Sequence, residues 1–159
     1  MHHNCKLLKI GDFGISEQLK YEGQQIETVQ ERGFPAYVAI ELFKEKKYTS
    51  SADVWSMGCI LFEMVHGKRL FSLEAGFHPR IVPHKLREKV LSYEHQPIKA
   101  TCPPEIKKII LKCVSQNPTD RPTSLEMLDD FIDLQFNAEL HKNKRNEQQQ
   151  RTQQTQEER

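Results

Sequence analysis

The sequence lacks the features that mark membrane, secreted and nucleic-acid-binding proteins. Its longest apolar run, residues 54–65, contains Ser56 and Glu63 and is shorter than the roughly 20 residues that cross a bilayer. Its four cysteines form no CxxC pair, which is typical of free thiols in a reducing compartment. With 23 Lys and Arg against 22 Asp and Glu, the net charge of +1 gives no field that attracts nucleic acid. We therefore expect an intracellular, cytoplasmic protein with no membrane span and no nucleic-acid partner.

Patterns typical of strands are scarce, and patterns typical of helices dominate. At 159 residues and 18.6 kDa the chain has the size of one domain. An apolar run at residues 7–10, closed by Gly11, predicts one short strand, and residues 15–19 are compatible with a second. The sequence therefore predicts a mainly α fold with one or two short strands near its N-terminus.

The central helix is predicted to begin near residue 50. Ser50 and Asp53 stand at the spacing of a capping box, and Gly67 closes the helix. Apolar residues occupy nearly every face between these ends, as they do in helices that are buried along the axis of a domain. We therefore expect this helix to be the core element.

Three further helices are predicted after it. Residues 86–93 form a short one, and a clearer one opens at Pro103 and Pro104 with apolar residues at helical spacing. Thr123 and Glu126 make a capping box for the last helix. Apolar residues nearly vanish from residue 137 onward, so we expect residues 1–136 to be the folded domain. Residues 137–159 are expected to be a Gln-rich, charged tail that is disordered or a frayed helix.

Four short motifs follow one another along the chain. They are Lys9-Ile10-Gly11-Asp12-Phe13-Gly14, Gly33-x-Pro35-x-Tyr37-x-Ala39-x-Glu41, Asp53-Val54-Trp55-Ser56-x-Gly58 and Asn117-Pro118-x-x-Arg121-Pro122-Thr123. Together they resemble the C-terminal lobe of a eukaryotic protein kinase of the Ser/Thr type, with residues 1–136 as a partial kinase domain. The resemblance implies a transferase that uses ATP and Mg²⁺ to phosphorylate Ser or Thr residues of proteins.

The first motif would carry the chemistry of the cofactor. Phosphoryl transfer spreads negative charge over the γ-phosphate, and Mg²⁺, which prefers carboxylate oxygens, neutralises it. By resemblance, Asp12 is the metal ligand, Phe13 packs inward as a regulatory apolar contact, and Gly14 lets the backbone turn sharply. These three residues are the predicted cofactor-binding residues. In the alternative interpretation, Asp12 is simply a turn residue.

Residues 12–41 resemble the activation segment of the family. Thr28 is the regulatory residue that the resemblance suggests for phosphorylation, and an ordinary loop threonine is an equally good interpretation. Pro35 and Val38 match positions that shape the substrate pocket.

The remaining motif residues match structural positions. Glu41 is expected to form a buried ion pair with Arg121, which would tie the activation segment to the helical lobe. Asp53 matches the helix anchor of the catalytic loop, and Ile60 and Met64 match apolar positions that support packing on the nucleotide side. Alternatively, Asp53 is only a favourable charge at a helix N-terminus.

The sequence also departs from the family pattern. Phe34 stands where Ser/Thr kinases usually have Thr, and Ile40 stands where they usually have Pro. The first departure puts the substrate-side geometry in doubt. Four histidines show no metal-ligand spacing and are interpreted as surface residues: His66, His78, His84 and His95.

Several parts of a kinase active site are missing from these residues. The sequence has no Gly-rich loop, no strand lysine and no His-Arg-Asp loop, so no catalytic residue is assigned, and the base is expected upstream of Met1. We therefore expect a fragment of a larger kinase that is inactive by itself and binds ATP and Mg²⁺ weakly. Two alternatives stay open. The chain could be a non-catalytic module or pseudokinase fragment that recruits a protein substrate or regulator through Pro35, Val38 and residues 71–100, or it could be unstable alone.

Overall fold

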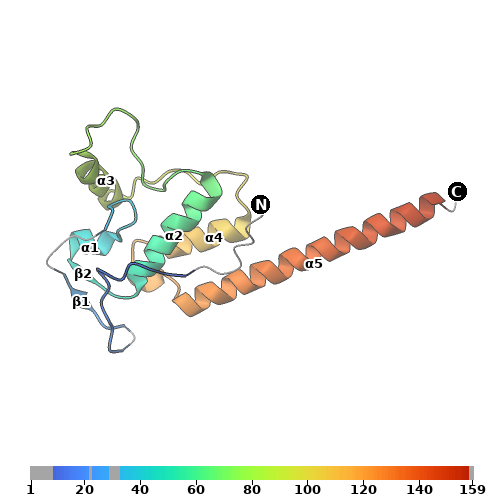
Figure 1. Cartoon of the computed structure of the whole chain (residues 1–159), viewed down its shortest axis with the longest axis horizontal. Helices are drawn as coiled ribbons and strands as arrows, with labels where there is room; N and C mark the ends of the chain where they lie inside the picture. The colour runs from blue at the N-terminus through green and yellow to red at the C-terminus, as the bar shows by residue number, and fades with distance from the viewer. Residues whose placement is uncertain (1–8, 22, 29–32, 158–159) are drawn as a thin grey trace.

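The fold is a body of short helices from which one long helix extends (Figure 1). The computed structural model describes residues 9–21, 23–28 and 33–157. Its helices are α1 (Ile40–Lys44), α2 (Ser51–His66), α3 (Val82–Leu91), α4 (Pro104–Cys113), the 3-10 helix η1 (Pro118–Asp120) and α5 (Ser124–Glu157). The prediction of a mainly α fold is confirmed. No helix in the described part of the chain is long and apolar enough to cross a membrane.

The small sheet lies elsewhere than the sequence predicted. β1 (Ile26–Glu27) pairs antiparallel with β2 (Lys47–Tyr48), with Ile26 opposite Tyr48. The predicted strand at residues 15–19 is wrong, because these residues are irregular. In the predicted strand at residues 7–10, residues 9 and 10 are also irregular, and residues 7 and 8 lie outside the described residues. A strand exists only where a second segment completes its hydrogen bonds, and periodicity does not reveal that partner.

The N-terminus of α2 is capped differently from the prediction. Ser50 has helical dihedral angles (φ −54°, ψ −20°) and makes no capping bond through its side chain, so the Ser50–Asp53 capping box is wrong. The residue before it takes this role, because Thr49 Oγ1 accepts a hydrogen bond from the Ser51 N–H at 3.3 Å. The helix ends as expected at Gly67, whose left-handed φ of 69° suits glycine.

Only one side of α2 is buried. The side chains of Trp55, Cys59 and Phe62 are at most 1% exposed and form the centre of the core with residues of α1, α3 and α4. The opposite side exposes Met57, Ile60 and Met64 at 48%, 42% and 76%. The prediction of a helix buried on all sides is therefore wrong for this chain, since no described segment covers these three side chains.

The core is closed by tight packing of α4 against α2. The predicted apolar face of α4 is observed, with Ile109, Ile110 and Cys113 buried. Gly58 makes the close approach possible, because a Cβ at this position would lie 2.6 Å from the Cys113 Cβ and 2.9 Å from the Val114 Cγ1. Burial raises the pKa of the Cys59 thiol to about 12. Cys59 therefore behaves as a small apolar residue.

The helices at the C-terminal end follow the sequence signals in part. α3 begins at Val82, four residues before the predicted 86–93 helix. The predicted capping box of α5 is present: the Thr123 N–H donates to Glu126 Oε2 at 2.7 Å, and the Glu126 N–H donates to Thr123 Oγ1 at 3.2 Å. α5 then continues as helix to Glu157. The boundary between a domain at 1–136 and a tail at 137–159 stays a prediction.

His66 is a structural residue and not a surface residue. Its side chain is 6% exposed and stacks on Phe62 at 3.9 Å between ring centroids. Its Nδ1 lies 2.9 Å from the Phe62 carbonyl oxygen, and its Nε2 accepts a hydrogen bond from the Lys99 N–H at 3.0 Å. A neutral imidazole that donates through Nδ1 and accepts through Nε2 satisfies both contacts, which fastens residues 95–100 to the end of α2.

Gly58 gives a sharp test of the packing. An alanine in a helix normally stabilises it by about 1 kcal/mol relative to glycine. Because the added methyl would collide with α4, we expect Gly58→Ala to lower the free energy of unfolding by about 1–3 kcal/mol instead. Urea unfolding followed by the fluorescence of Trp55, the single tryptophan, measures this.

Gly11→Ala is the matched control, because a Cβ at Gly11 has no atom within 4 Å. It should leave the unfolding midpoint unchanged. A Gly58→Ala variant that is as stable as the original chain, or more stable, would contradict the packing described here.

Candidate functional site

The Asp12-Phe13-Gly14 motif lies in an exposed, irregular segment. Asp12 adopts a left-handed φ of 63°, a conformation that is uncommon for residues other than glycine. The Phe13 carbonyl oxygen accepts hydrogen bonds from the Ser16 N–H and hydroxyl at 3.1 Å and 2.7 Å, which closes a turn. Phe13 is 66% exposed, so the expectation that it packs inward is wrong within the described residues.

Within Asp12-Phe13-Gly14, Asp12 is the residue that offers a metal a carboxylate. No group of three or more His, Cys, Asp or Glu side chains that could hold a metal occurs among the described residues. Mg²⁺ needs about six oxygen ligands, which phosphates and water can supply only if a nucleotide is held nearby. Asp12 is therefore the candidate metal ligand of this motif, and no further ligand is assigned among the described residues.

Thr28 lies at the end of the small sheet. Its N–H donates a hydrogen bond to the Lys46 carbonyl oxygen at 2.8 Å. Beside it, Lys47 Nζ pairs with Glu27 Oε1 at 3.0 Å across β1 and β2. A cavity of about 270 Å³ is lined by these residues and Glu45. The sheet thus brings the predicted regulatory threonine next to two lysines that the sequence separates from it by 18 and 19 positions.

The predicted substrate-pocket residues differ in exposure. Pro35 is half-buried, whereas Val38 is 8% exposed and belongs to the core. Gly33, with a φ of 91°, brings the backbone close to Val38, because a Cβ there would lie 3.5 Å from its Cγ2. Val38 thus positions the loop from inside, and Pro35 is the more accessible of the two.

The same loop is held by side chains to which the sequence motifs assigned no role. Tyr37 donates a hydrogen bond to the Glu63 carboxylate at 2.5 Å, and the Ser56 hydroxyl donates to the Tyr37 carbonyl oxygen at 2.8 Å. Burial and the neighbouring Glu63 raise the pKa of Tyr37. Ser56 and Glu63 are the two polar residues inside the apolar run 54–65, and that interruption was the available signal.

Phe34 contacts a cation in the structure. The Arg69 guanidinium carbon lies 4.8 Å from the centroid of the Phe34 ring, within the range of a cation–π interaction. Phe34 is 41% exposed, so this pair forms an accessible edge of the loop. The residue that departs from the family pattern is therefore held in place by a contact of its own.

Glu41 and Arg121 form the strongest polar contact of the described structure. Arg121 Nη1 and Nη2 donate to Glu41 Oε1 and Oε2 at 2.8 Å and 2.7 Å, in a bidentate pair. The side chains are 0% exposed for Arg121 and 6% for Glu41. Arg121 also donates to the carbonyl oxygens of Ser115 and Ser51 at 2.9 Å and 3.1 Å, and its guanidinium lies 4.9 Å from the Trp55 ring. One guanidinium therefore joins α1, α2 and the segment between α4 and α5.

Asp53 lies on the exposed side of α2. No described residue donates a hydrogen bond to its carboxylate, although partial desolvation raises its pKa above the ordinary value. Ile60 and Met64, the other positions matched on this helix, are exposed on the same side. The structure thus places a carboxylate and an apolar surface together.

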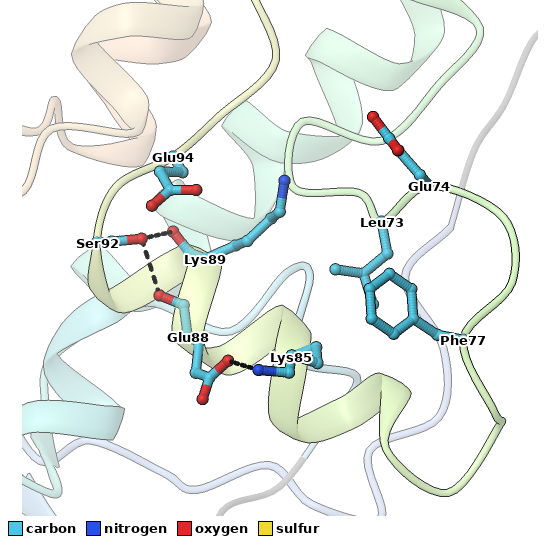
Figure 2. A pocket seen from close by; sticks show the side chains of 8 residues that line it. All are labelled: Leu73, Glu74, Phe77, Lys85, Glu88, Lys89, Ser92 and Glu94. Carbon is cyan, nitrogen blue, oxygen red and sulfur yellow. Dashed lines mark hydrogen bonds and ion pairs between the residues drawn. The ribbon is translucent and has the colours of Figure 1, made fainter.

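A pocket lies between α3 and the loop that precedes it (Figure 2). Leu73, Glu74 and Phe77 line it from the loop, and Lys85, Glu88, Lys89, Ser92 and Glu94 line it from α3 and the residues after it. Its volume is about 290 Å³. The Lys85 ammonium donates to Glu88 Oε2 at 2.7 Å and lowers the pKa of that carboxyl. The pocket falls within residues 71–100, the surface predicted for partner binding.

Comparison with known proteins agrees with the motifs. The family model described as protein kinase domain matches residues 1–132. The serine/threonine-protein kinase Nek8 of Danio rerio is 34% identical over 122 residues, which are 77% of this chain and 16% of that protein. The serine/threonine-protein kinase VIK of Arabidopsis thaliana is 30% identical over 76% of this chain and 27% of its own length. The serine/threonine-protein kinase PLK1 of Xenopus laevis is 30% identical over 77% of this chain and 19% of its own length. The chain therefore spans about a quarter or less of these relatives.

The Glu41–Arg121 pair predicts a large stability effect. Glu41→Gln keeps the shape of the side chain but leaves the buried guanidinium without its counter-ion. We expect it to lower the free energy of unfolding by about 3–5 kcal/mol, as is usual when one partner of a buried ion pair is removed. Urea unfolding followed by Trp55 fluorescence gives the value.

Glu88→Gln is the matched control, since it removes the same charge from the exposed Lys85–Glu88 pair. It should leave the midpoint unchanged, because solvent already screens that pair. Equal effects of the two substitutions would show that the buried pair has no special role.

Proposed function

The chain belongs to the protein kinase family, and from that premise we propose that its residues form the C-terminal lobe of a Ser/Thr kinase domain. In the complete domain, this lobe presents a protein substrate to ATP and Mg²⁺ for transfer of the γ-phosphoryl group to Ser or Thr. The observation that best supports this proposal is that side-chain contacts fix the loop of residues 33–41 at two points. Tyr37 is bonded to Glu63 on α2, and Glu41 is bonded to Arg121. A loop fixed at these points is pre-organised to hold a peptide.

The exposed side of α2 supports the one-lobe proposal. Met57, Ile60 and Met64 are exposed on the helix whose other side is the core of the domain. Exposed apolar surfaces of this kind are normally covered in a complete protein. Asp53 adds an unpaired carboxylate to the same side, which suits backbone N–H groups of a segment that lies on it. We propose that the nucleotide-binding lobe and the catalytic loop, which carry the catalytic base, come from residues upstream of Met1 and cover this side.

Asp12 supplies one metal ligand in this proposal. When bound, ATP and Mg²⁺ would supply the phosphoryl group and the charge that stabilises its transfer, and Asp12 would hold the metal through a carboxylate oxygen. Phe13 would be covered when the other lobe is present. The chain alone is therefore inactive.

Thr28 is proposed as the regulatory residue of the activation segment. A phosphate on its hydroxyl would stand beside Lys46 and Lys47, which line the same cavity. These lysines could hold it by charge-assisted hydrogen bonds in competition with Glu27. Such a phosphate would strengthen the contact between the activation segment and the turn that precedes α2.

A second function is favoured by the pocket of Figure 2. Its apolar side chains, Leu73 and Phe77, lie near three charged side chains of α3: Lys85, Glu88 and Lys89. Such a mixture is typical of surfaces that bind protein segments. In this alternative the chain is a non-catalytic, kinase-like module that recruits a partner and never binds a nucleotide. The two proposals differ in whether any longer form of the protein binds ATP.

An ATP titration tests the one-lobe proposal. The purified 159-residue chain should show no micromolar binding of ATP–Mg²⁺ by isothermal calorimetry, because a single carboxylate does not hold the metal tightly and the sequence has no Gly-rich loop for the phosphates. Micromolar binding by this chain would contradict the proposal.

The longer product of the gene provides the second arm. If it carries the upstream parts, it should phosphorylate a protein substrate, and Asp12→Asn should lower kcat at least about 100-fold, since a metal contact is worth several kcal/mol in the transition state. Glu17→Gln, which removes an exposed carboxylate of the same segment, is the control and should retain activity. A longer product that also fails to bind ATP would favour the recruiting module.

A further inference from the structure

A basic groove runs along α4. It is lined by Pro104, Lys107, Lys108, Leu111, Lys112, Ser115 and Asp120, and its volume is about 580 Å³. Three lysines against one aspartate make the lining positive. Leu111 is 40% exposed and gives the groove an apolar floor. A groove of this composition fits a partner that presents apolar side chains flanked by carboxylates.

Such a surface exists on α5 of the same chain. The first turns of α5 pack on the core through Met127, Phe131 and Leu134. A second row of apolar side chains on α5 is 41–66% exposed: Leu125, Leu128, Ile132, Phe136 and Leu140. We call this row the acidic stripe because carboxylates lie next to it. Residues 124–140 hold five carboxylates and no Lys or Arg: Glu126, Asp129, Asp130, Asp133 and Glu139. The stripe is therefore apolar and negative, the complement of the groove.

The groove and the acidic stripe are neighbours on one molecule. Lys112, which lines the groove, lies 3.8 Å from the Asp130 carboxylate of α5. The stripe itself is on the far side of α5 from the packed residues, because Ile132 and Phe136 each stand about 160° around the helix from Leu134. The stripe therefore cannot fold into the groove of its own chain. α5 also reaches well beyond the body, where a second molecule can meet it (Figure 1).

We propose that two copies of this chain associate about a two-fold axis, with the acidic stripe of each lying on the basic groove of the other. Two complementary patches that adjoin on one surface are what a closed, isologous dimer requires, because each contact is made twice. A second copy also covers both features at once. An unrelated acidic helix would fill the groove but would leave the stripe exposed.

Charge should set the strength of this association. The lysines and carboxylates at the contact are exposed in the single chain, apart from the half-buried Asp130, so salt screens their attraction. The Debye length falls from about 10 Å at 0.1 M salt to about 3 Å at 1 M. We expect the dissociation constant to rise at least about tenfold over this range, although the apolar contact itself persists in salt.

A charge-exchange experiment tests the proposal on the full chain. Sedimentation equilibrium of the 159-residue protein should give a dimer mass at 0.1 M salt. The basic-groove variant K107E/K108E and the stripe variant D129K/D133K should each be monomeric, because each places like charges opposite one another. An equimolar mixture of the two variants should again give a dimer, since both reciprocal contacts are then attractive.

Matched controls keep the result interpretable. K44E/K68E makes the same charge change on exposed lysines outside the groove and should still dimerise. Circular dichroism checks that each variant is folded, and Leu111→Asp serves as an independent groove variant if one charge variant is not. A wild-type chain that stays monomeric, one that forms only aggregates without a defined mass, or a variant mixture that stays monomeric would overturn the proposal.

Discussion

The buried pair between Glu41 and Arg121 is the contact on which the described structure depends. Its two residues are 80 positions apart, and the guanidinium also binds the carbonyl oxygens of Ser51 and Ser115 and faces Trp55. A buried charge is costly unless every donor is satisfied. The arrangement is therefore stable only when α1, the start of α2 and the end of α4 are all in place, which makes these parts one cooperative unit.

The molecule has a packed side, which contains this unit, and an exposed side, where apolar residues face solvent. On the packed side, the Gly58 contact and the His66 bonds hold α4 and residues 95–100 against α2, and the Glu41–Arg121 pair fixes the end of the loop of residues 33–41. The exposed side carries Asp12, Phe13 and the exposed apolar residues of α2, which are Met57, Ile60 and Met64. A protein kinase domain needs both a fixed substrate platform and a nucleotide site, and we propose that these residues supply the first. We propose that the nucleotide site is completed on the exposed side.

The sequence predicted what depends on local signals and missed what depends on distant partners. The helices around Trp55 and Ile109, the stop at Gly67 and the Thr123–Glu126 cap all follow from short-range patterns, and the structure has them. The position of the sheet was missed because Ile26 pairs with Tyr48 across 22 positions. His66 was misread because its partners, Phe62 and Lys99, give a histidine no sequence signature. The exposed face of α2 was missed because composition does not show which apolar residues lack a partner.

Native-state hydrogen exchange of the amides of α1 tests the central claim most directly. If the Glu41–Arg121 pair makes this short helix part of the cooperative core, the amides from Glu45 back to Phe43 should exchange only through global unfolding, at the same free energy as the core of α2. Exchange of these amides at the rate of the exposed residues 9–21, while α2 stays protected, would contradict it. The Glu41–Arg121 pair would then not fasten α1 to the core.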